Sequence, residues 1–270
     1  MLDLTIHPEY EDLIKSIQEL ENQLSILVEK RDTLLFTICP NLQTEYMLKI
    51  GKIEYSIFEF QCKILRLKRK IEMIQSFLNK DLQYNIKSID EQLDFEYKEY
   101  TEKLIQKQKE IEEARIKKSN RGRLLTVEEA EELRKLYLEI VKKLHPDINP
   151  ELTEEQHGHY IDAVNAYKNG DLSEIRIIFM LLERTSVNKK YKEDTLEKLK
   201  ERKKSLLIES EHLMSEIDKI KESYPYNIKE LICNKDKIKY VVDELTKKLT
   251  DCSDQYNKLE SRIKEMLKDE

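Results

Sequence analysis

Residues 141–151 read VKKLHPDINPE and hold two of the five prolines in a chain that has only four glycines. The helix-forming run before this stretch must stop at His145, because Pro146 disfavours helical geometry in the residue that precedes it. His145, Pro146 and Asp147 are therefore predicted to lie in a tight turn between two helices. The ring of Pro146 fixes part of the backbone of this turn.

Amphipathic helices are predicted on both sides of the turn. The helix before it carries apolar residues on one face, at Leu133, Leu136, Tyr137, Ile140, Val141 and Leu144. The helix after it carries Tyr160, Ala163, Val164 and Tyr167 and ends at Gly170, and a third runs from Leu172 through Ile175 and Phe179 to Leu182. Such short helices are marginal alone, so we expect them to bury their apolar faces against one another.

Capping boxes mark the start of each of these three helices. In each one a short oxygen-bearing side chain precedes a carboxylate or amide by three residues, and the pairs are Thr126 with Glu129, Thr153 with Gln156, and Asp171 with Glu174. Gly122, in the stretch NRGRLLT, separates this segment from the long helices before it. The sequence thus predicts a small helical module over residues 119–185.

Heptad patterns flank the module and predict coiled coils. The first seam is Leu13, Ile17, Leu20, Leu24, Leu27, Arg31 and Leu34, and the second is Ile53, Ile57, Phe60, Ile64, Leu67, Ile71, Ile74 and Leu78. Pro40 lies between them and is expected to end the first helix. We therefore predict an antiparallel hairpin, with a connecting helix, in a domain of residues 1–118.

A second hairpin is predicted for residues 186–270. Its seams run over residues 196–220 and 228–266, and the stretch SYPYN, with Pro225, separates them. Residues 79–86 could form either a turn or a stutter in a continuous helix. The expected fold is all-α, with elongated antiparallel coiled-coil hairpins flanking the small module.

The composition narrows the class of protein. Charged residues make up 38% of the 270 residues, with a net charge of −6 that is mixed along the chain, so neither nucleic acid nor one large core is indicated. No apolar run is long enough to span a membrane, and no leader pattern is present, which predicts a soluble cytoplasmic protein. The four widely separated cysteines, Cys39, Cys62, Cys233 and Cys252, are expected to be reduced thiols.

The stretches LRKLYLEIVKKLHPDINP and HYIDAVNAYKNGDL resemble helix II, the His-Pro-Asp loop and helix III of a J-domain. This DnaJ-like module activates DnaK-type chaperone ATPases. The resemblance covers about sixty residues in the middle of the chain and leaves out the flanking coiled coils. The first helix of the family is not recognisable, so we expect its place to be taken by the long helix ending near Lys118 or by the adjacent coiled coil.

The resemblance implies which residues would contact the chaperone. His145 and Asp147 are the implied activating pair, and Pro146 is implied to fix the turn that presents both side chains to water. A basic face would meet the acidic surface of the chaperone, and its members here are Arg134, Lys135, Lys142 and Lys143. Leu138 and Glu139 stand where the family usually has basic residues, so this face is less positive.

These features lead to two hypotheses for the function. The first is a co-chaperone or adaptor that recruits a DnaK-type chaperone, while the coiled coils select a protein client. The alternative is a coiled-coil scaffold with a vestigial J-like module. No nucleotide-binding loop, nucleophile motif or metal-binding pattern is present, so we expect no catalytic residues, no metal and no cofactor. The seams could pair within one chain or between chains, which leaves a homo-oligomer open.

Overall fold

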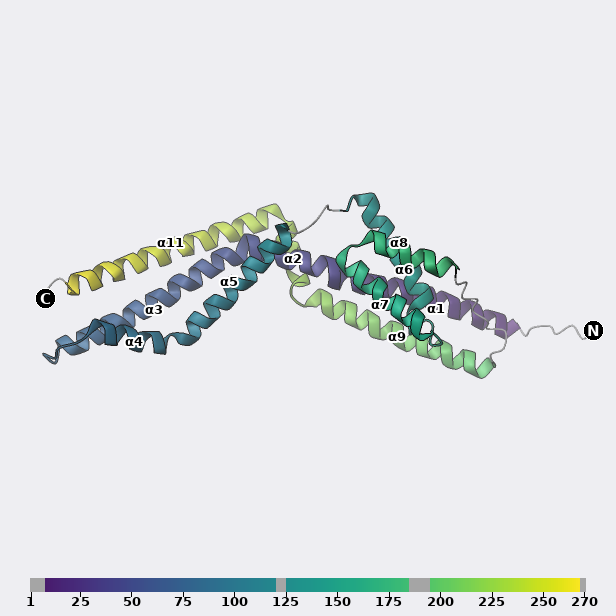
Figure 1. Ribbon diagram of the computed structural model, residues 1–270, viewed down its shortest axis with the longest axis horizontal. Coiled ribbons are helices and arrows are strands. Elements are labelled where there is room, and N and C mark those ends of the chain that lie inside the picture. Colours follow the sequence, from purple (N-terminus) through teal and green to yellow (C-terminus); the bar gives the residue numbers. More distant parts are fainter. Residues whose placement is uncertain (1–7, 120–124, 185–194, 268–270) are drawn as a thin grey trace, which may run out of the picture. The chain divides into compact units, whose positions relative to one another are not determined.

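The computed structural model describes residues 8–119, 125–184 and 195–267, and every regular element in these ranges is a helix (Figure 1). The all-α fold class predicted from the sequence is confirmed. The first half of the chain contains α1 (Pro8–Thr33), η1 (Leu34–Ile38), α2 (Cys39–Tyr46), η2 (Met47–Gly51), α3 (Lys52–Leu78), α4 (Ile86–Glu96) and α5 (Lys98–Ser119). The second half contains α6 (Val127–Leu144), α7 (Glu154–Asn169), α8 (Leu172–Arg184), α9 (Leu196–Glu222), η4 (Tyr226–Ile228), α10 (Lys229–Cys233) and α11 (Lys235–Met266).

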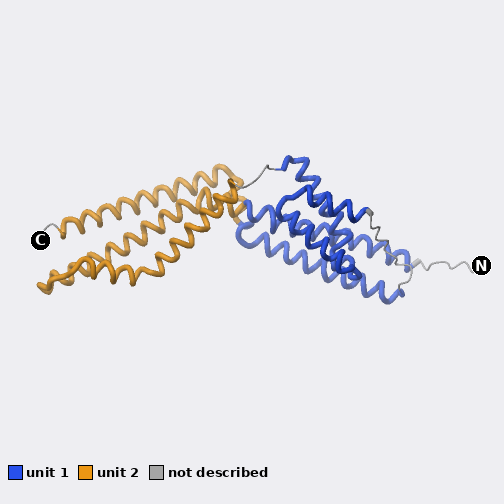
Figure 2. Tube along the Cα trace, in the orientation of Figure 1, with its two compact units in different colours: residues 1–41, 123–227 blue, residues 42–122, 228–270 orange. Residues whose placement is uncertain are grey.

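The chain divides into two compact units, each made from segments that are far apart in the sequence (Figure 2). Unit 1 combines residues 1–41 with 123–227, and unit 2 combines residues 42–122 with 228–270. These units differ from the three consecutive domains expected from the sequence. The reason is that the long helices pair across the sequence, with α1 packed on α9 and α3 packed on α11.

The predicted hairpin turn at Pro40 does not form. Helical elements follow one another without a break from Pro8 to Leu78, through the π-helical stretches η1 and η2. The Cys39 N–H donates to the carbonyl of Leu34, five residues back, so η1 contains a wider turn than an α-helix. Pro40 follows this wider turn directly, and the helix passes through it although proline has no N–H to donate.

In unit 1 the helices α1 and α9 lie side by side and run parallel (Figure 1). Lys200 Nζ lies 2.8 Å from a Glu9 oxygen near the start of both helices, and Arg31 Nη1 lies 3.8 Å from Glu216 Oε2 near their ends. Parallel pairing replaces both predicted hairpins, because α9 packs on α1 in unit 1 whereas α11 belongs to unit 2.

The central module packs on α1 through α6. Helix α6 contacts α1, α7 and α8, so of the two segments expected to pack on the module, the adjacent coiled coil does so. Lys118, near the end of the other candidate helix, pairs with Glu45 in unit 2. A single apolar core joins the module to the coiled coil, and its fully buried members include Ile17, Leu24, Val28, Ile140, Val141, Leu144, Ala163 and Ile175.

Sequence signals at the ends of the module helices are confirmed. Thr126 and Thr153 form complete capping boxes with Glu129 and Gln156. At the start of α8 the Glu174 N–H donates to Asp171 Oδ1 at 3.0 Å. Gly170 ends α7 with a positive φ of 70°, which a residue without a Cβ adopts at low cost, and Gly122 lies outside the described residues.

Unit 2 is organised around α3, which contacts α11, α5 and α4. Helices α3 and α11 also run parallel, since the rings of Phe60 and Tyr256 are 5.7 Å apart and Met266 packs against the cluster at Ile74. Residues 79–86 include a turn that ends α3, with Asp81 at a positive φ of 51°. Ion pairs then hold α4 against α3, between Arg66 and Asp94, Arg69 and Glu96, and Lys70 and Asp90.

The parallel packing of α1 yields a first prediction. Leu24 of α1 is fully buried in the core that the coiled coil shares with the module, so Leu24→Ala should lower the free energy of unfolding by about 2–5 kcal/mol. Ile26, two residues further on, is 52% exposed, and Ile26→Ala should cost less than about 0.5 kcal/mol. Urea titrations followed by circular dichroism would measure both. Equal losses in the two variants would contradict this assignment of the buried face.

Candidate functional site

His145 ends α6 and is the hydrogen-bonding centre of the turn that follows. This residue leaves helical geometry, with φ −68° and ψ 129°, as expected before a proline. Its carbonyl accepts hydrogen bonds from the N–H groups of Ile148 and Asn149, at 3.0 and 2.8 Å. Its Nδ1 accepts a third hydrogen bond, at 3.2 Å, from the N–H of Asp147. His145 therefore organises the backbone of the turn as well as ending the helix.

Asn149 secures the turn to the end of α6. Its side-chain Nδ2 donates to the carbonyls of Lys142 and Lys143, at 3.0 and 2.7 Å, and these carbonyls lie in the last helical turn. The last four carbonyls of a helix have no partner within the helix, so the buried amide satisfies groups that would otherwise need water. The sequence analysis assigned no role to Asn149, although a short amide just beyond a helix end is a possible capping residue.

The His145 imidazole is buried, which corrects the expectation that its ring stands out in water. The side chain is 8% exposed, and its ring meets the edge of the Tyr160 ring with centroids 5.3 Å apart. Burial lowers the pKa of His145, and the nearby charge of Arg31 adds to this, while Asp147 and Asp32 act in the opposite direction. A neutral imidazole suits the turn, because a protonated Nδ1 could not accept the Asp147 N–H.

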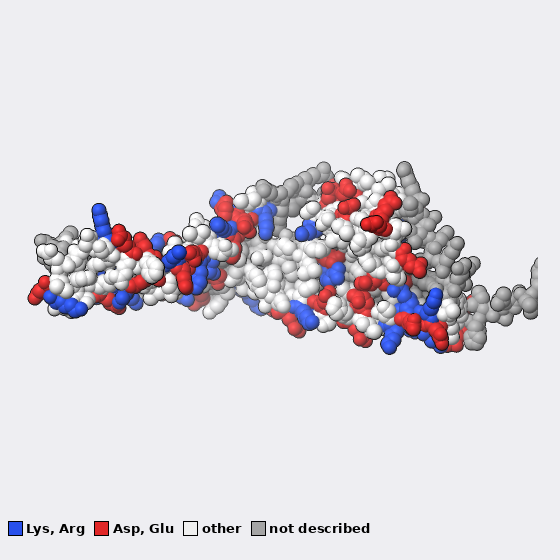
Figure 3. Space-filling view, turned by 60° about the horizontal axis from the view of Figure 1, so that its bottom comes forward, with Lys and Arg blue, Asp and Glu red and all other residues white. Residues whose placement is uncertain are grey.

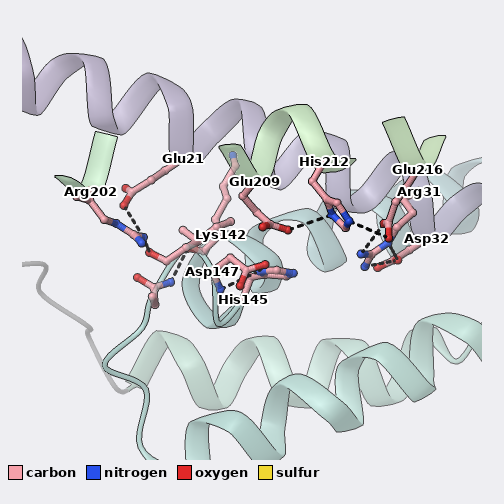
Figure 4. A network of polar contacts seen from close by, with 12 residues as sticks. Glu21, Arg31, Asp32, Lys142, His145, Asp147, Arg202, Glu209, His212 and Glu216 are labelled. Atoms are coloured by element: carbon pink, nitrogen blue, oxygen red, sulfur yellow. Dashed lines mark hydrogen bonds and ion pairs between the residues drawn. The ribbon is translucent and has the colours of Figure 1, made fainter. Parts of the chain in front are cut away.

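Asp147 remains accessible, with 47% of its side chain exposed. Its Oδ2 lies 3.6 Å from His145 Nδ1, so the exposed carboxylate is next to the buried imidazole (Figure 4). A shallow hollow adjoins this carboxylate. The loop contributes Pro146, Asp147 and Pro150 to its lining, and α9 contributes Arg202, Ser205, Leu206 and Glu209. A group that reaches Asp147 through this hollow must therefore contact α9 as well.

The predicted basic face is largely engaged in contacts within unit 1. Arg134 makes a bidentate contact with Glu29 of α1, with its Nε and Nη2 at 2.7 and 3.2 Å from the two carboxylate oxygens. The hydroxyl groups of Thr33 and Tyr167 also donate hydrogen bonds to Glu29, at 2.7 and 3.3 Å. Burial alone would raise the pKa of Glu29, but hydrogen bonds from Arg134 and Thr33 and the charge of Arg134 hold it below its ordinary value.

The three lysines of the predicted face differ in their surroundings. Lys142 forms an ion pair with Glu139 at 2.7 Å, and the ammonium of Lys143 lies 5.3 Å from the centre of the Phe179 ring. Lys135 is exposed. The structure thus places all four basic residues on α6 but commits Arg134 to α1, so the face offered to a partner is narrower than predicted.

A buried polar contact joins α1 to the module next to the turn. The Tyr137 hydroxyl donates to Asp32 Oδ2 at 2.6 Å, and the other Asp32 oxygen accepts from Arg31 Nε at 2.9 Å. Tyr137 is fully buried and its ring stacks on that of Tyr167, with centroids 4.0 Å apart. Burial raises the pKa of Tyr137 far above its usual range, and the Asp32 charge adds to this, so the hydroxyl keeps its proton.

The described residues form neither a surface area of one charge on the face in Figure 3 nor a metal-binding cluster. Acidic and basic side chains are interspersed on the face drawn in Figure 3, with no large area of a single sign. No group of three or more His, Cys, Asp or Glu side chains in the described ranges could hold a metal ion. None of the helices described is long and apolar enough to cross a bilayer.

Comparisons with known proteins identify no relative. No protein-family model, no curated protein and no solved structure matches the chain. The resemblance to a J-domain therefore depends on the sequence around the turn, and the geometry of that turn carries the functional argument.

Removing one hydroxyl tests the contact between α1 and the module. Tyr137→Phe deletes the donor to buried Asp32 and should cost about 1.5–3 kcal/mol, the value of a hydrogen bond to a charged group. Tyr256→Phe removes a weaker bond to Glu260 at 3.3 Å in unit 2 and should cost less than about 1 kcal/mol. Urea titration measures both. A loss for Tyr137→Phe no larger than that of the control would show that the contact contributes little.

The lowered pKa of His145 predicts how stability depends on pH. Above its ordinary pKa of about 6.5 the imidazole is neutral in both the folded and unfolded states. Below that value the unfolded chain binds the proton first, so the free energy of unfolding falls as the pH drops toward the lowered pKa of the folded state. His145→Gln should flatten this part of the curve, measured by urea titration at several pH values.

His157→Gln supplies the control for the substitution itself. His157 lies on α7 and is exposed to solvent. A change of slope in His145→Gln that His157→Gln does not reproduce would follow from the buried position of His145. If His145→Gln leaves the slope unchanged, the burial of the imidazole has no linkage to folding.

Proposed function

We propose that this protein is a co-chaperone or adaptor of the J-domain type, which recruits and stimulates a DnaK-type chaperone ATPase. The observation that carries the proposal is the rigid turn at the end of α6, which holds the Asp147 carboxylate in solvent beside a hollow. The antiparallel pair of α6 and α7 around a His-Pro-Asp turn supports the resemblance read from the sequence.

Asp147 is the residue that would contact the chaperone directly. Its carboxylate accepts hydrogen bonds and suits a guanidinium group of the partner, in a charge-assisted contact. Three hydrogen bonds to His145 already order the turn, so little backbone freedom is lost when a partner binds. His145 contributes from inside the protein, by fixing the turn rather than by contacting the partner.

The coiled-coil helices would select the client or assembly on which the chaperone acts. Unit 2 carries large apolar side chains in solvent, among them Phe95 at 82% exposed and Tyr240 at 68% exposed. Aromatic side chains on a surface otherwise rich in charge favour contacts with other proteins. The cytoplasm, where DnaK-type chaperones act, is the compartment that fits this proposal.

A structural scaffold is the second candidate, and the contact between Arg134 and Glu29 favours it. An arginine of the predicted docking face is used to fix the module to α1 through two short hydrogen bonds. In a scaffold the turn would serve only to connect α6 and α7, and Asp147 could be replaced without consequence.

Single-turnover ATP hydrolysis by the host's DnaK-type chaperone separates the two functions. The wild-type protein should accelerate hydrolysis, and Asp147→Asn should abolish most of the acceleration because it removes the charge that binds the partner. Asp162→Asn, at an exposed position on α7, is the matched control and should accelerate hydrolysis like the wild type. No acceleration by the wild type, or equal acceleration by Asp147→Asn, would favour the scaffold.

A further inference from the structure

We infer that Arg202 of α9 is a positioning residue for the turn, and that the pair of α1 and α9 thereby sets how readily a partner can use Asp147. The second part of this inference rests on the proposed function. The first part concerns the turn alone and can be tested without any partner.

Arg202 joins three elements at one point beside the turn (Figure 4). Its Nη2 donates to the carbonyl of Ile148, in the turn, at 2.5 Å. The same nitrogen lies 3.5 Å from a carboxylate oxygen of Glu21 on α1. The side chains of Arg202 and Glu21 are 19% and 8% exposed, so both groups are largely withdrawn from water.

Within the turn, the carbonyl of Ile148 has its hydrogen-bond donor in Arg202. The N–H groups of Asp147, Ile148 and Asn149 are all bound to His145. Ile148 itself is 2% exposed, and its carbonyl has the Arg202 guanidinium as its donor. A partly buried carbonyl that loses its donor favours a different backbone conformation, so Arg202 stabilises the conformation that presents the adjacent Asp147.

Glu21 makes this contact depend on the coiled coil. A buried guanidinium needs a negative partner, and Glu21 supplies it from α1. Leu206, one helical turn after Arg202, is buried in the core shared with α1 and also lines the hollow beside Asp147. Separation of α9 from α1 would therefore withdraw both the donor to Ile148 and one wall of the hollow.

Asp147 stays 47% exposed while α9 is in place, so α9 adjoins the carboxylate without covering it. For this reason we assign Arg202 a supporting role and not an inhibitory one. Loss of the guanidinium should weaken the partner's binding, because the turn must then be ordered during docking. The maximal stimulation should be unchanged, since Asp147 itself is intact.

Hydrogen exchange of the full-length protein tests the first part. Arg202→Met should speed exchange of the amides of residues 147–149 by roughly tenfold, while amides in the middle of α7 keep their wild-type rates. Because Arg202→Met also removes a positive charge beside the buried Glu21, the double variant Arg202→Met with Glu21→Gln should be measured too, and it should show the same faster exchange. Lys200→Met, which removes a surface ion pair with Glu9, is the control.

Chaperone titrations test the second part. With Arg202→Met, the concentration for half-maximal stimulation of ATP hydrolysis should rise roughly three- to tenfold at an unchanged maximal rate. Arg202→Lys keeps a charge for Glu21 and one donor, and should recover part of the loss. The positioning role would be overturned if the turn amides exchange at the wild-type rate in Arg202→Met and in the double variant with Glu21→Gln. A lower half-maximal concentration for Arg202→Met would show instead that α9 restrains the turn.

The two readouts separate this inference from the proposed function. If the wild-type protein does not stimulate the chaperone, the proposed function fails, and the exchange rates alone decide whether Arg202 holds the turn. If the wild-type protein stimulates the chaperone but the turn amides exchange at the wild-type rate in Arg202→Met and in its double variant with Glu21→Gln, the proposed function stands and the role of Arg202 is rejected.

Discussion

The position of the turn depends on the contact between α1 and the central module. Acidic side chains of α1 are buried at this contact, and Glu29 and Asp32 are each satisfied by groups from the module, chiefly Arg134 and Tyr137. A buried carboxylate without donors would cost several kcal/mol, so these partners are required wherever α1 and α6 pack together. These hydrogen bonds form in one register of α6 on α1, so they add specificity to the apolar packing.

This arrangement divides the residues of the J-like segment into an inner and an outer set. His145 and Arg134, both expected to meet a partner, have internal partners instead, and they fix the turn and the helix that carries it. Of the two implied activating residues, His145 and Asp147, only Asp147 keeps its access to solvent. The Asp147 side chain can thus be exposed on an ordered turn, because His145 makes the hydrogen bonds that hold the backbone of the turn.

Local features of the fold could be predicted from the sequence. The caps at Thr126 and Thr153, the end of α7 at Gly170 and the end of α6 before Pro146 each depend on a few neighbouring residues, and each was found. The partners of the long helices could not be predicted, because heptads report that a face is apolar and not which helix covers it. The helix break predicted at Pro40 was wrong. The π-helical turn just before Pro40 allows the helix to continue through the proline.

The parts of the site that were missed came from distant segments. Arg202 lies 54 residues beyond Ile148 and in a different predicted domain, so no local pattern connects the two. Asn149 was within the quoted motif, but its capping of the α6 carbonyls depends on the conformation of the turn. The sequence therefore identified the exposed acid and its turn, whereas the contact from Arg202 became apparent only with the pairing of α1 and α9.

The discontinuous make-up of the two units has a consequence for how the protein comes into being. Unit 1 needs residues up to about 222 and unit 2 needs the segment beyond 228, so neither can close while the ribosome is still translating the middle of the chain. Until α9 has been synthesised, the apolar face of α1 that packs on it stays exposed, and exposed apolar surface of this kind promotes aggregation. The interval before α9 is complete is therefore the stage of synthesis at which unit 1 is most exposed to aggregation.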